Sequence, residues 1–327
     1  MKLHITIDRS LSGVYVCGVN ENAVEGHMMS QLAAPLDKET AADRLLKGSV
    51  KRSYAPVVDI DWTAPMEPGK YFLPAQVLSL YGTPMWESMS TEQRIELSRQ
   101  EAANILSIGI WFENILNQSL LKSLMHHDPG SLHSRYMLTE MGDECRHMTM
   151  FGRAIERMGA KPYQLRPAQA VVANLLPKLF RGNMLWVAAL IGEEIFDATQ
   201  RRVVDDPDLQ PLIARLMRIH VTEEARHIRF AREGVRRRVA ESHPVEKVWV
   251  GVVNGVGGIL FRRLFINAVM YKRAGLDPKE AARQAWANPH FREVSEQGFA
   301  PLAAFLAENG LLLAPARAMW CRGGFLR

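Results

Sequence analysis

Two short segments of the sequence repeat one pattern of acids and histidines. Residues 143–147 (DECRH) and 223–227 (EEARH) are near copies, and they place Glu144 before His147 and Glu224 before His227 at the same spacing. In a helix, residues three apart project from one face, so each pair can reach a single metal ion. Two such helices facing each other can hold two metal ions. Carboxylate oxygen together with imidazole nitrogen suits iron or manganese.

A single Glu-x-x-His pair is weak evidence for a metal, because both residues are ordinary on solvated helix faces. Two copies, on separate helical segments that also carry apolar residues such as Phe151 and Phe230, are difficult to explain as solvated faces. A metal-free scaffold would have to bury several ionisable side chains without a cation, and each unpaired charge is strongly destabilising. The repeat therefore predicts a metal centre.

A two-metal bundle also needs one carboxylate from each of two further helices. Glu113 lies in an apolar stretch, with Ile110 before it and Leu116 after it at helical spacing. An acid at such a position is destabilising unless a cation lies beside it. Glu101 is the competing acid on this segment, but its polar neighbours predict a solvent-exposed side chain.

The segments around residues 193 and 220 each leave two interpretations of a possible ligand open. Glu193 and Glu194 are adjacent, so they point about 100° apart and the pattern alone does not choose between them. His220, Glu224 and His227 are spaced four and then three residues apart, which places them along one stripe of a helix. His220 is therefore either a third imidazole ligand or a buried histidine beside the site.

Four long helices can position these residues. Ser90 followed by Gln93 is typical of a capping box at a helix start, and Asp128-Pro129-Gly130 is typical of a stop. The apolar segment from Val248 to Phe261 is shorter than a bilayer span and is interpreted as a buried core helix, so no membrane span is expected. The long helices are expected over residues 90–126, 132–158, 183–204 and 208–241, with a short helix at 168–180.

The two ends of the chain differ from this central region. Residues 1–88 contain two β-like runs, His4–Ile7 and Val14–Cys17, followed by a proline-rich stretch, and they predict an irregular N-terminal wrap. Residues 89–327 are expected to form one all-α domain that makes one compact unit with the wrap. Its additional C-terminal helices begin at Asp277-Pro278 and around Pro301 to Glu308.

Composition and charge exclude several classes of protein. The net charge of +5 is small for 327 residues, and basic residues are mixed with acidic ones without a basic run, so nucleic acid is not an expected partner. Cys17, Cys145 and Cys321 form no Cys-x-x-Cys pair, which fits a reducing cytoplasm. The charged N-terminus does not match a secretion signal.

Three segments, RIHVTEEARH, LIGEEIFDATQ and DECRH, together resemble the AurF-like arylamine N-oxygenases, ferritin-like proteins whose type member oxidises p-aminobenzoate. The resemblance spans roughly residues 90–235. It implies that His220 is a ligand and that Glu193 is the ligand on the third long helix. In the family, the ligand on the first long helix lies at a set distance from a Met-His pair at the helix end, and Met125-His126 therefore selects Glu113. The implied di-iron ligands are Glu113, Glu144, His147, Glu193, His220, Glu224 and His227.

The resemblance also implies an activity. Two iron ions would activate dioxygen through a peroxo di-ferric state, take electrons from a reductase or ferredoxin, and oxygenate the nitrogen of a small amine. The acting form would be a homodimer. A C–H hydroxylase or desaturase could use the same ligands, and a ferroxidase or iron-storage protein is less expected from so long a chain. A radical-generating subunit would need a tyrosine where this chain has Phe151.

Overall fold

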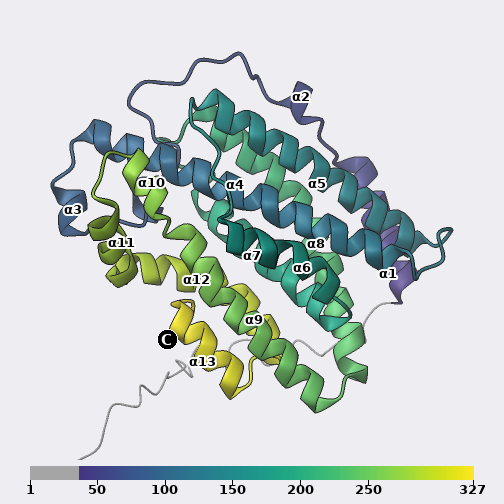
Figure 1. The fold of residues 1–327 in the computed structure, drawn as a ribbon. Helices are drawn as coiled ribbons and strands as arrows, with labels where there is room; N and C mark the ends of the chain where they lie inside the picture. Colours follow the sequence, from purple (N-terminus) through teal and green to yellow (C-terminus); the bar gives the residue numbers. More distant parts are fainter. Residues whose placement is uncertain (1–36) are drawn as a thin grey trace, which may run out of the picture.

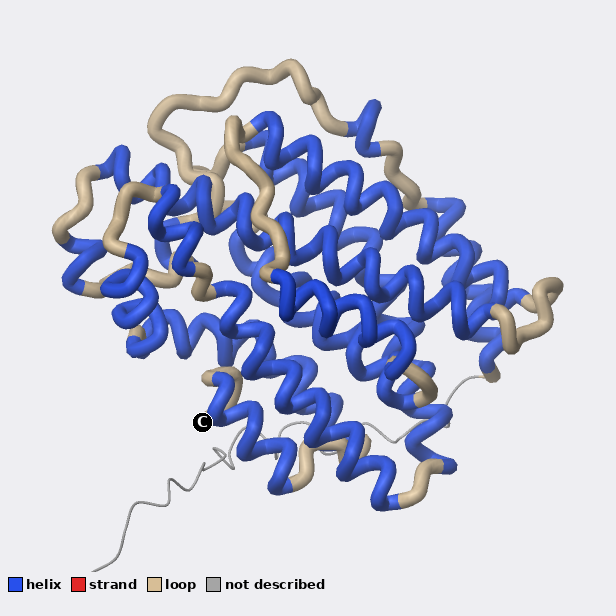
Figure 2. The backbone as a smooth tube through the Cα atoms, viewed as in Figure 1, coloured by secondary structure: helices blue, strands red, loops and turns tan. Residues whose placement is uncertain are grey.

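The computed structural model describes residues 37–327, which form helices joined by loops (Figure 2). Within these residues there is no β-strand, only an isolated bridge between Tyr71 and Leu209. The expected β-like runs lie outside the described residues. The elements are α1 (Lys38–Lys51), α2 (Pro56–Asp59), η3 (Ala75–Val77), α3 (Pro84–Glu87), α4 (Thr91–Leu124), α5 (Leu132–Arg157), α6 (Pro167–Leu179), α7 (Asn183–Val203), α8 (Pro211–Glu241), α9 (Pro244–Phe265), α10 (Ala268–Arg273), α11 (Pro278–Ala287), α12 (Pro289–Glu308) and α13 (Ala314–Gly323).

The four long helices α4, α5, α7 and α8 form the central bundle (Figure 1), which confirms the all-α prediction. Their ends fall within a few residues of the predicted positions. The predicted capping box is present, because the Ser90 hydroxyl accepts from the Gln93 N–H at 3.3 Å and the Gln93 side chain accepts from the Ser90 N–H at 3.0 Å. Local sequence signals therefore define where the bundle helices begin and end.

The expected irregular N-terminal segment is in part helical. α1 begins after Asp37, whose carboxylate accepts from the Thr40 N–H, and it packs against α5 and α8. The prediction missed α1 because its buried stripe is narrow, with Ala41, Ala42 and Leu45 as its apolar members. The rest of the described N-terminal part consists of loops and single-turn helices that lie over the bundle (Figure 1).

The C-terminal part contains more helix than the sequence predicted. The helix expected around residues 301–308 is the second half of α12, which starts at Pro289 with the Asn288 side chain accepting from the His290 N–H. Pro301 lies inside this helix, so interpreting it as a helix start was wrong. α13 was not predicted at all, because its short segment has little apolar periodicity.

The glycine-rich helix α9 packs closely against the chain end. A Cβ atom added to Gly251, Gly255 or Gly258 would meet atoms of residues 311–320 at 2.3 to 2.7 Å. The glycines therefore allow α13 to approach the backbone of α9. Residues Pro244–Arg273 are also long and apolar enough to cross a membrane, by length and composition alone. One such helix is weak evidence for a membrane span, because core helices of soluble proteins pass the same test.

We expect Gly258→Ala to lower the free energy of unfolding by about 1–3 kcal/mol, because the new methyl group would meet the Trp320 ring at 2.3 Å. Gly257→Ala is the matched control, since its Cβ meets nothing within 4 Å and alanine favours the helix. Urea unfolding of the two variants and the parent chain measures this. Equal midpoints for the two variants would show that α13 does not pack here.

The buried apolar residues of the described chain form two clusters, and the buried polar residues of the bundle lie between them. On α8, buried apolar residues of one cluster end at Ile219 and those of the other begin at Phe230. On α5, the corresponding residues are Met141 and Met150. The repeated acid and histidine segments therefore sit between two apolar layers, where they are shielded from water.

Candidate metal centre

All seven residues predicted as ligands are buried in the middle of the bundle. They come from α4, α5, α7 and α8, and none is more than 4% exposed. The two Glu-x-x-His pairs lie on α5 and α8, while α4 and α7 supply one predicted acid each. The residues are Glu113, Glu144, His147, Glu193, His220, Glu224 and His227.

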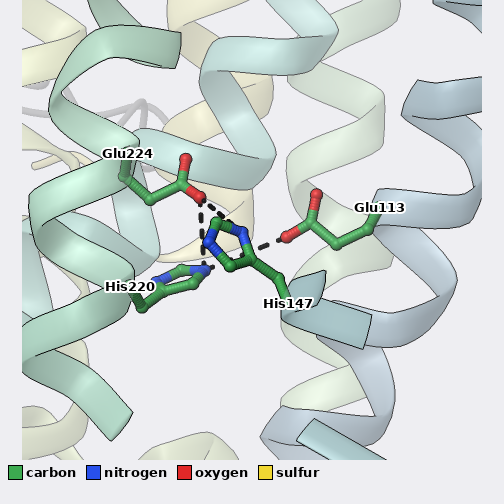
Figure 3. Close-up of side chains that lie close together, drawn as sticks. All are labelled: Glu113, His147, His220 and Glu224. Carbon is green, nitrogen blue, oxygen red and sulfur yellow. Dashed lines mark ion pairs between the residues drawn. The ribbon is translucent and has the colours of Figure 1, made fainter. Parts of the chain in front are cut away.

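Six of these seven residues form two overlapping groups of potential ligand atoms. Within each group the atoms lie within 4.8 Å of one another. The first group contains Glu113, His147, His220 and Glu224, and Figure 3 shows these side chains pointing toward one another. The second contains Glu144, Glu224 and His227. Because Glu224 belongs to both groups, its carboxylate would help to hold both metal ions.

The His147 ring is oriented by acids on both of its nitrogens. Its Nδ1 atom lies 2.8 Å from Glu144 Oε2 and 3.2 Å from Glu224 Oε1, inside the site. Its Nε2 atom lies 3.0 Å from Glu223 Oε2. With a proton on Nε2 donated to Glu223, Nδ1 keeps its lone pair for a metal ion.

The His227 ring has the same arrangement with the helices exchanged. Its Nδ1 lies 2.7 Å from Glu144 Oε1, and its Nε2 lies 3.2 Å from Asp143 Oδ2. The acid that precedes the Glu of one repeat thus holds the histidine of the other repeat. Asp143 and Glu223 are therefore the acids that orient the two histidines, and sequence reasoning missed the role of Glu223.

His220 lies beside the same group of atoms. Its Nδ1 is 2.9 Å from Gln200 Oε1 on α7, while its Nε2 is 3.4 Å from Glu224 Oε1 and 3.9 Å from Glu113 Oε1. Burial lowers the pKa of His220 to about 4, so the ring is neutral at neutral pH. A neutral ring that donates from Nδ1 to Gln200 presents the Nε2 lone pair to the site.

Several potential ligand atoms of the centre have no hydrogen-bond partner. Both carboxylate oxygens of Glu193 and of Glu224 have no hydrogen-bond partner among the described residues, and neither do Glu113 Oε2 and His220 Nε2. Burial raises the pKa of Glu113 well above its usual range, and the charges of Glu144 and Glu224 add to this effect. Since buried polar atoms are nearly always paired, the donor set fits two divalent cations.

The structure distinguishes the two adjacent acids on α7. Glu194 forms an ion pair with Arg232, so its carboxylate already has a cationic partner. Glu193 has no such partner, and burial raises its pKa well above the usual range, with the Glu224 carboxylate as a further cause. Glu193 is therefore the α7 acid that faces the centre.

Glu101 differs from its prediction. It is 5% exposed, not solvent-facing, and it accepts from the Ser79 N–H at 3.1 Å and from the Ser79 hydroxyl at 2.5 Å. The prediction was wrong because the chain before α4 folds back over this part of the helix. Glu101 lies about three turns from Glu113, outside the groups of ligand atoms.

Glu140 is a further acid that sequence reasoning missed. It is 1% exposed, and burial raises its pKa well above the usual range, with the Glu144 carboxylate among the further causes. Glu140 precedes Glu144 by four residues, as His220 precedes Glu224, so the repeat extends one helical turn before residues 143 and 223. That extended spacing was the signal that could have found it.

We expect Asp143→Ala to weaken binding of one of two metal ions by about 10–100-fold, because His227 would lose the acid that fixes its ring. Titration of the metal-free protein with ferrous or manganous ion measures the two affinities. Asp205→Ala, which removes an exposed acid paired with Arg218, is the control. Unchanged affinity in Asp143→Ala would contradict the orienting role.

A four-helix bundle with a Glu-x-x-His pair on two helices and a buried glutamate on each of the other two defines a ferritin-like di-metal carboxylate protein. Residues 35–310 match the family described as P-aminobenzoate N-oxygenase AurF. The chain belongs to this family, and it is an oxidoreductase with a di-metal centre. The resemblance seen in the sequence is confirmed.

The individual proteins that this chain resembles in sequence carry no description of an activity. The chain is 32% identical over 295 residues to uncharacterized proteins of Mycobacterium bovis and Mycobacterium tuberculosis, covering 84% of this chain and 84% of each relative. Among solved structures, an R2-like ligand-binding oxidase with a Mn/Fe cofactor aligns with a TM-score of 0.41 at 13% identity, over 91% of this chain and 96% of that chain. This distant likeness adds nothing to the family assignment.

Proposed function

We propose that the centre binds two iron ions and uses dioxygen to oxygenate the nitrogen of an amine substrate. The observation that carries this proposal is the pair of overlapping groups of buried acid and imidazole atoms, including the third imidazole of His220. The chain's family is described by an arylamine N-oxygenation. The proposed ligands are Glu113, Glu144, His147, Glu193, His220, Glu224 and His227.

The atoms and electrons of the proposed oxygenation balance with one external two-electron donor. When bound, the iron pair supplies the reductive activation of dioxygen. An amine, dioxygen, two electrons and two protons give a hydroxylamine and water, so one oxygen atom goes to nitrogen and the other to water. The two electrons come from a separate donor, for which we propose a reductase or ferredoxin, and we propose a cytoplasmic homodimer as the acting form.

The protein's own residues prepare the centre for this reaction. Glu223 and Asp143 hold protons on the outer nitrogens of His147 and His227, and Gln200 does the same for His220. The inner nitrogens are then free to bind metal. The apolar layers above and below exclude water from the centre, which limits side reactions there.

A labelled-oxygen experiment tests the proposal. The protein is loaded with ferrous ion, reduced, and mixed with ¹⁸O₂ and a series of primary amines, and products are identified by mass spectrometry. We expect two irons per chain and a hydroxylamine that carries one labelled oxygen. Loading with manganese in a parallel sample tests the identity of the metal. A protein that binds no stoichiometric metal would overturn the proposal.

A C–H hydroxylase or desaturase is the second candidate, because the cavity beside the centre is lined mainly by apolar residues. Such a lining suits a hydrocarbon substrate. The same experiment separates the candidates. Labelled oxygen on carbon indicates hydroxylation, and a product that has lost two hydrogens without gaining oxygen indicates desaturation.

A further inference from the structure

A buried arginine joins the two acids that orient the histidines of the centre. Arg226 on α8 is 8% exposed. Its Nη2 atom donates to Asp143 Oδ2 at 3.2 Å and lies 3.8 Å from Glu223 Oε1. Asp143 Oδ2 also lies 3.2 Å from His227 Nε2, and Glu223 Oε2 lies 3.0 Å from His147 Nε2. One guanidinium group therefore pairs with the supports of both histidines.

The two arginines of the repeated segments have different contacts. Arg146 occupies the same position in its repeat as Arg226 does in the other. The Arg146 guanidinium pairs with Asp143 of its own repeat, and its side chain is 39% exposed. No ion pair joins Arg146 to Glu223 in the part of the chain that the structure describes, whereas Arg226 pairs with the acids of both repeats. Glu223 therefore takes its second contact from another part of the chain.

That contact comes from the backbone that follows α1. The Tyr54 N–H donates to Glu223 Oε1 at 3.1 Å. Two residues earlier, the carbonyl oxygen of Arg52 accepts from Arg226 Nη1 at 2.9 Å. α1 itself packs against α5 and α8, the two helices that carry the repeats (Figure 1). Residues 52–54 thus hold both Glu223 and the arginine beside it.

These contacts fix the positions of two buried charges. Asp143 is 2% exposed and Glu223 is 0% exposed. A buried carboxylate that loses its partner is strongly destabilising, and hydrogen bonds to ionised groups are stronger than those between neutral groups. Without Arg226 the two acids would lose the cation that they share. The orientation of both imidazole rings would then be less well fixed.

The same contacts should respond to metal binding. An imidazole that binds a cation through one nitrogen becomes a stronger donor at the other, because the cation withdraws electron density from the ring. His147 with a bound ion would therefore hold Glu223 more firmly in the place where the Tyr54 N–H meets it. Such a coupling is reciprocal, so a contact that improves metal binding is improved by the metal to the same extent.

We propose that Arg226 is a positioning residue shared by both metal positions and that residues 52–54 close over it. Metal binding and the docking of residues 52–54 then stabilise each other. The inference rests on the proposed function for the two metal ions, but it depends neither on dioxygen nor on an amine. It gives the chain that precedes the bundle a role in metal binding.

Metal affinity tests the role of Arg226. The metal-free full chain is titrated with manganous ion in a calorimeter. We expect Arg226→Gln to weaken the binding of both ions by about tenfold each, because both orienting acids lose a partner. Arg226→Lys keeps the charge and should recover part of this loss. Unchanged affinities in Arg226→Gln, or a loss for one ion only, would overturn the shared role.

Two further arginines provide matched controls for this titration. Arg146→Gln should weaken mainly one ion, because Arg146 pairs with Asp143 and not with Glu223. Arg218→Gln makes the same change at an exposed position of α8, where the side chain pairs with Asp205, and both affinities should be unchanged. Equal effects of Arg226→Gln and Arg218→Gln would contradict the proposal.

Hydrogen exchange of one backbone amide tests the coupling to residues 52–54. We expect the Tyr54 amide to exchange about tenfold more slowly when manganous ion is bound. The Thr63 amide is the control, because its N–H is donated at 2.9 Å to the exposed carboxylate of Asp61, which holds no histidine. Equal rates at Tyr54 with and without the ion would overturn the coupling. This comparison uses the parent chain, so it decides even where Arg226→Gln does not fold.

A pair of variants separates the Tyr54 backbone from its side chain. Tyr54→Pro and Tyr54→Ala both remove the ring, which faces the Arg215 guanidinium, but only proline also removes the N–H. We expect Tyr54→Pro to bind at least one ion about tenfold more weakly than Tyr54→Ala does. Equal affinities in the two variants would contradict a role for this amide.

The result is separable from the proposed amine oxidation. A protein that binds two ions with affinities independent of Arg226 and of the Tyr54 amide loses this inference and keeps the iron chemistry. Conversely, a protein in which both respond as expected, but which yields no nitrogen-oxygenated product from any amine, keeps this inference and loses the proposed reaction.

Discussion

Replacing Glu224 with alanine is expected to remove both metal ions from the centre and to lower oxidase activity by about three orders of magnitude or more. The reason is that the Glu224 carboxylate is the only side chain that belongs to both groups of ligand atoms. Its loss takes a ligand from each ion and leaves the facing imidazoles without a shared partner. Metal content by elemental analysis and dioxygen consumption measure the effect.

The control for this variant is Glu241→Ala, which removes an exposed acid from the end of the same helix. It should retain two metal ions per chain and full activity. If Glu224→Ala kept both ions, the carboxylate would not be a ligand that the two ions need, and the interpretation of the two groups as one centre would fail.

Removal of the metal ions is expected to destabilise the whole protein. A bound ion held at about one hundred times its dissociation constant adds about 2.7 kcal/mol to the free energy of unfolding. Two ions would therefore raise the melting temperature by on the order of 10 °C. The structural reason is that buried acids such as Glu113 and Glu193 otherwise lack partners.

Thermal unfolding of the chelated and the iron-loaded protein measures this stabilisation. The Glu224→Ala variant serves as the control, because its melting temperature should hardly respond to added iron. An iron-independent melting temperature in the parent chain would indicate that the buried acids are stable as neutral groups and that metal is not part of the fold.

The supporting contacts explain why these ions would stabilise the fold as well as the site. Asp143 on α5 holds His227 on α8, and Glu223 on α8 holds His147 on α5. Gln200 on α7 holds His220 on α8. The centre and its supports thus link three helices of the bundle, and Glu113 adds the fourth. Binding two ions would fix the relative positions of all four helices.

Much of this arrangement could be predicted from the sequence, because it depends on short-range spacing. The Glu-x-x-His repeat fixed which faces of α5 and α8 carry ligands, and the Ser90 capping box defined the start of α4. A helix places residues three and four apart on one face whatever surrounds it. The helical class and most of the predicted site residues follow from that rule.

Other features depended on which segments meet in space. Glu194 is paired with Arg232, which lies 38 residues away, and this left Glu193 to face the centre. Glu101 became buried because Ser79 folds over it, and the ring of His220 is set by Gln200. Helical periodicity gives the face on which a side chain lies, but the partner that it meets there depends on long-range packing. Only the tertiary structure could therefore decide these contacts and the apolar cavity beside the centre.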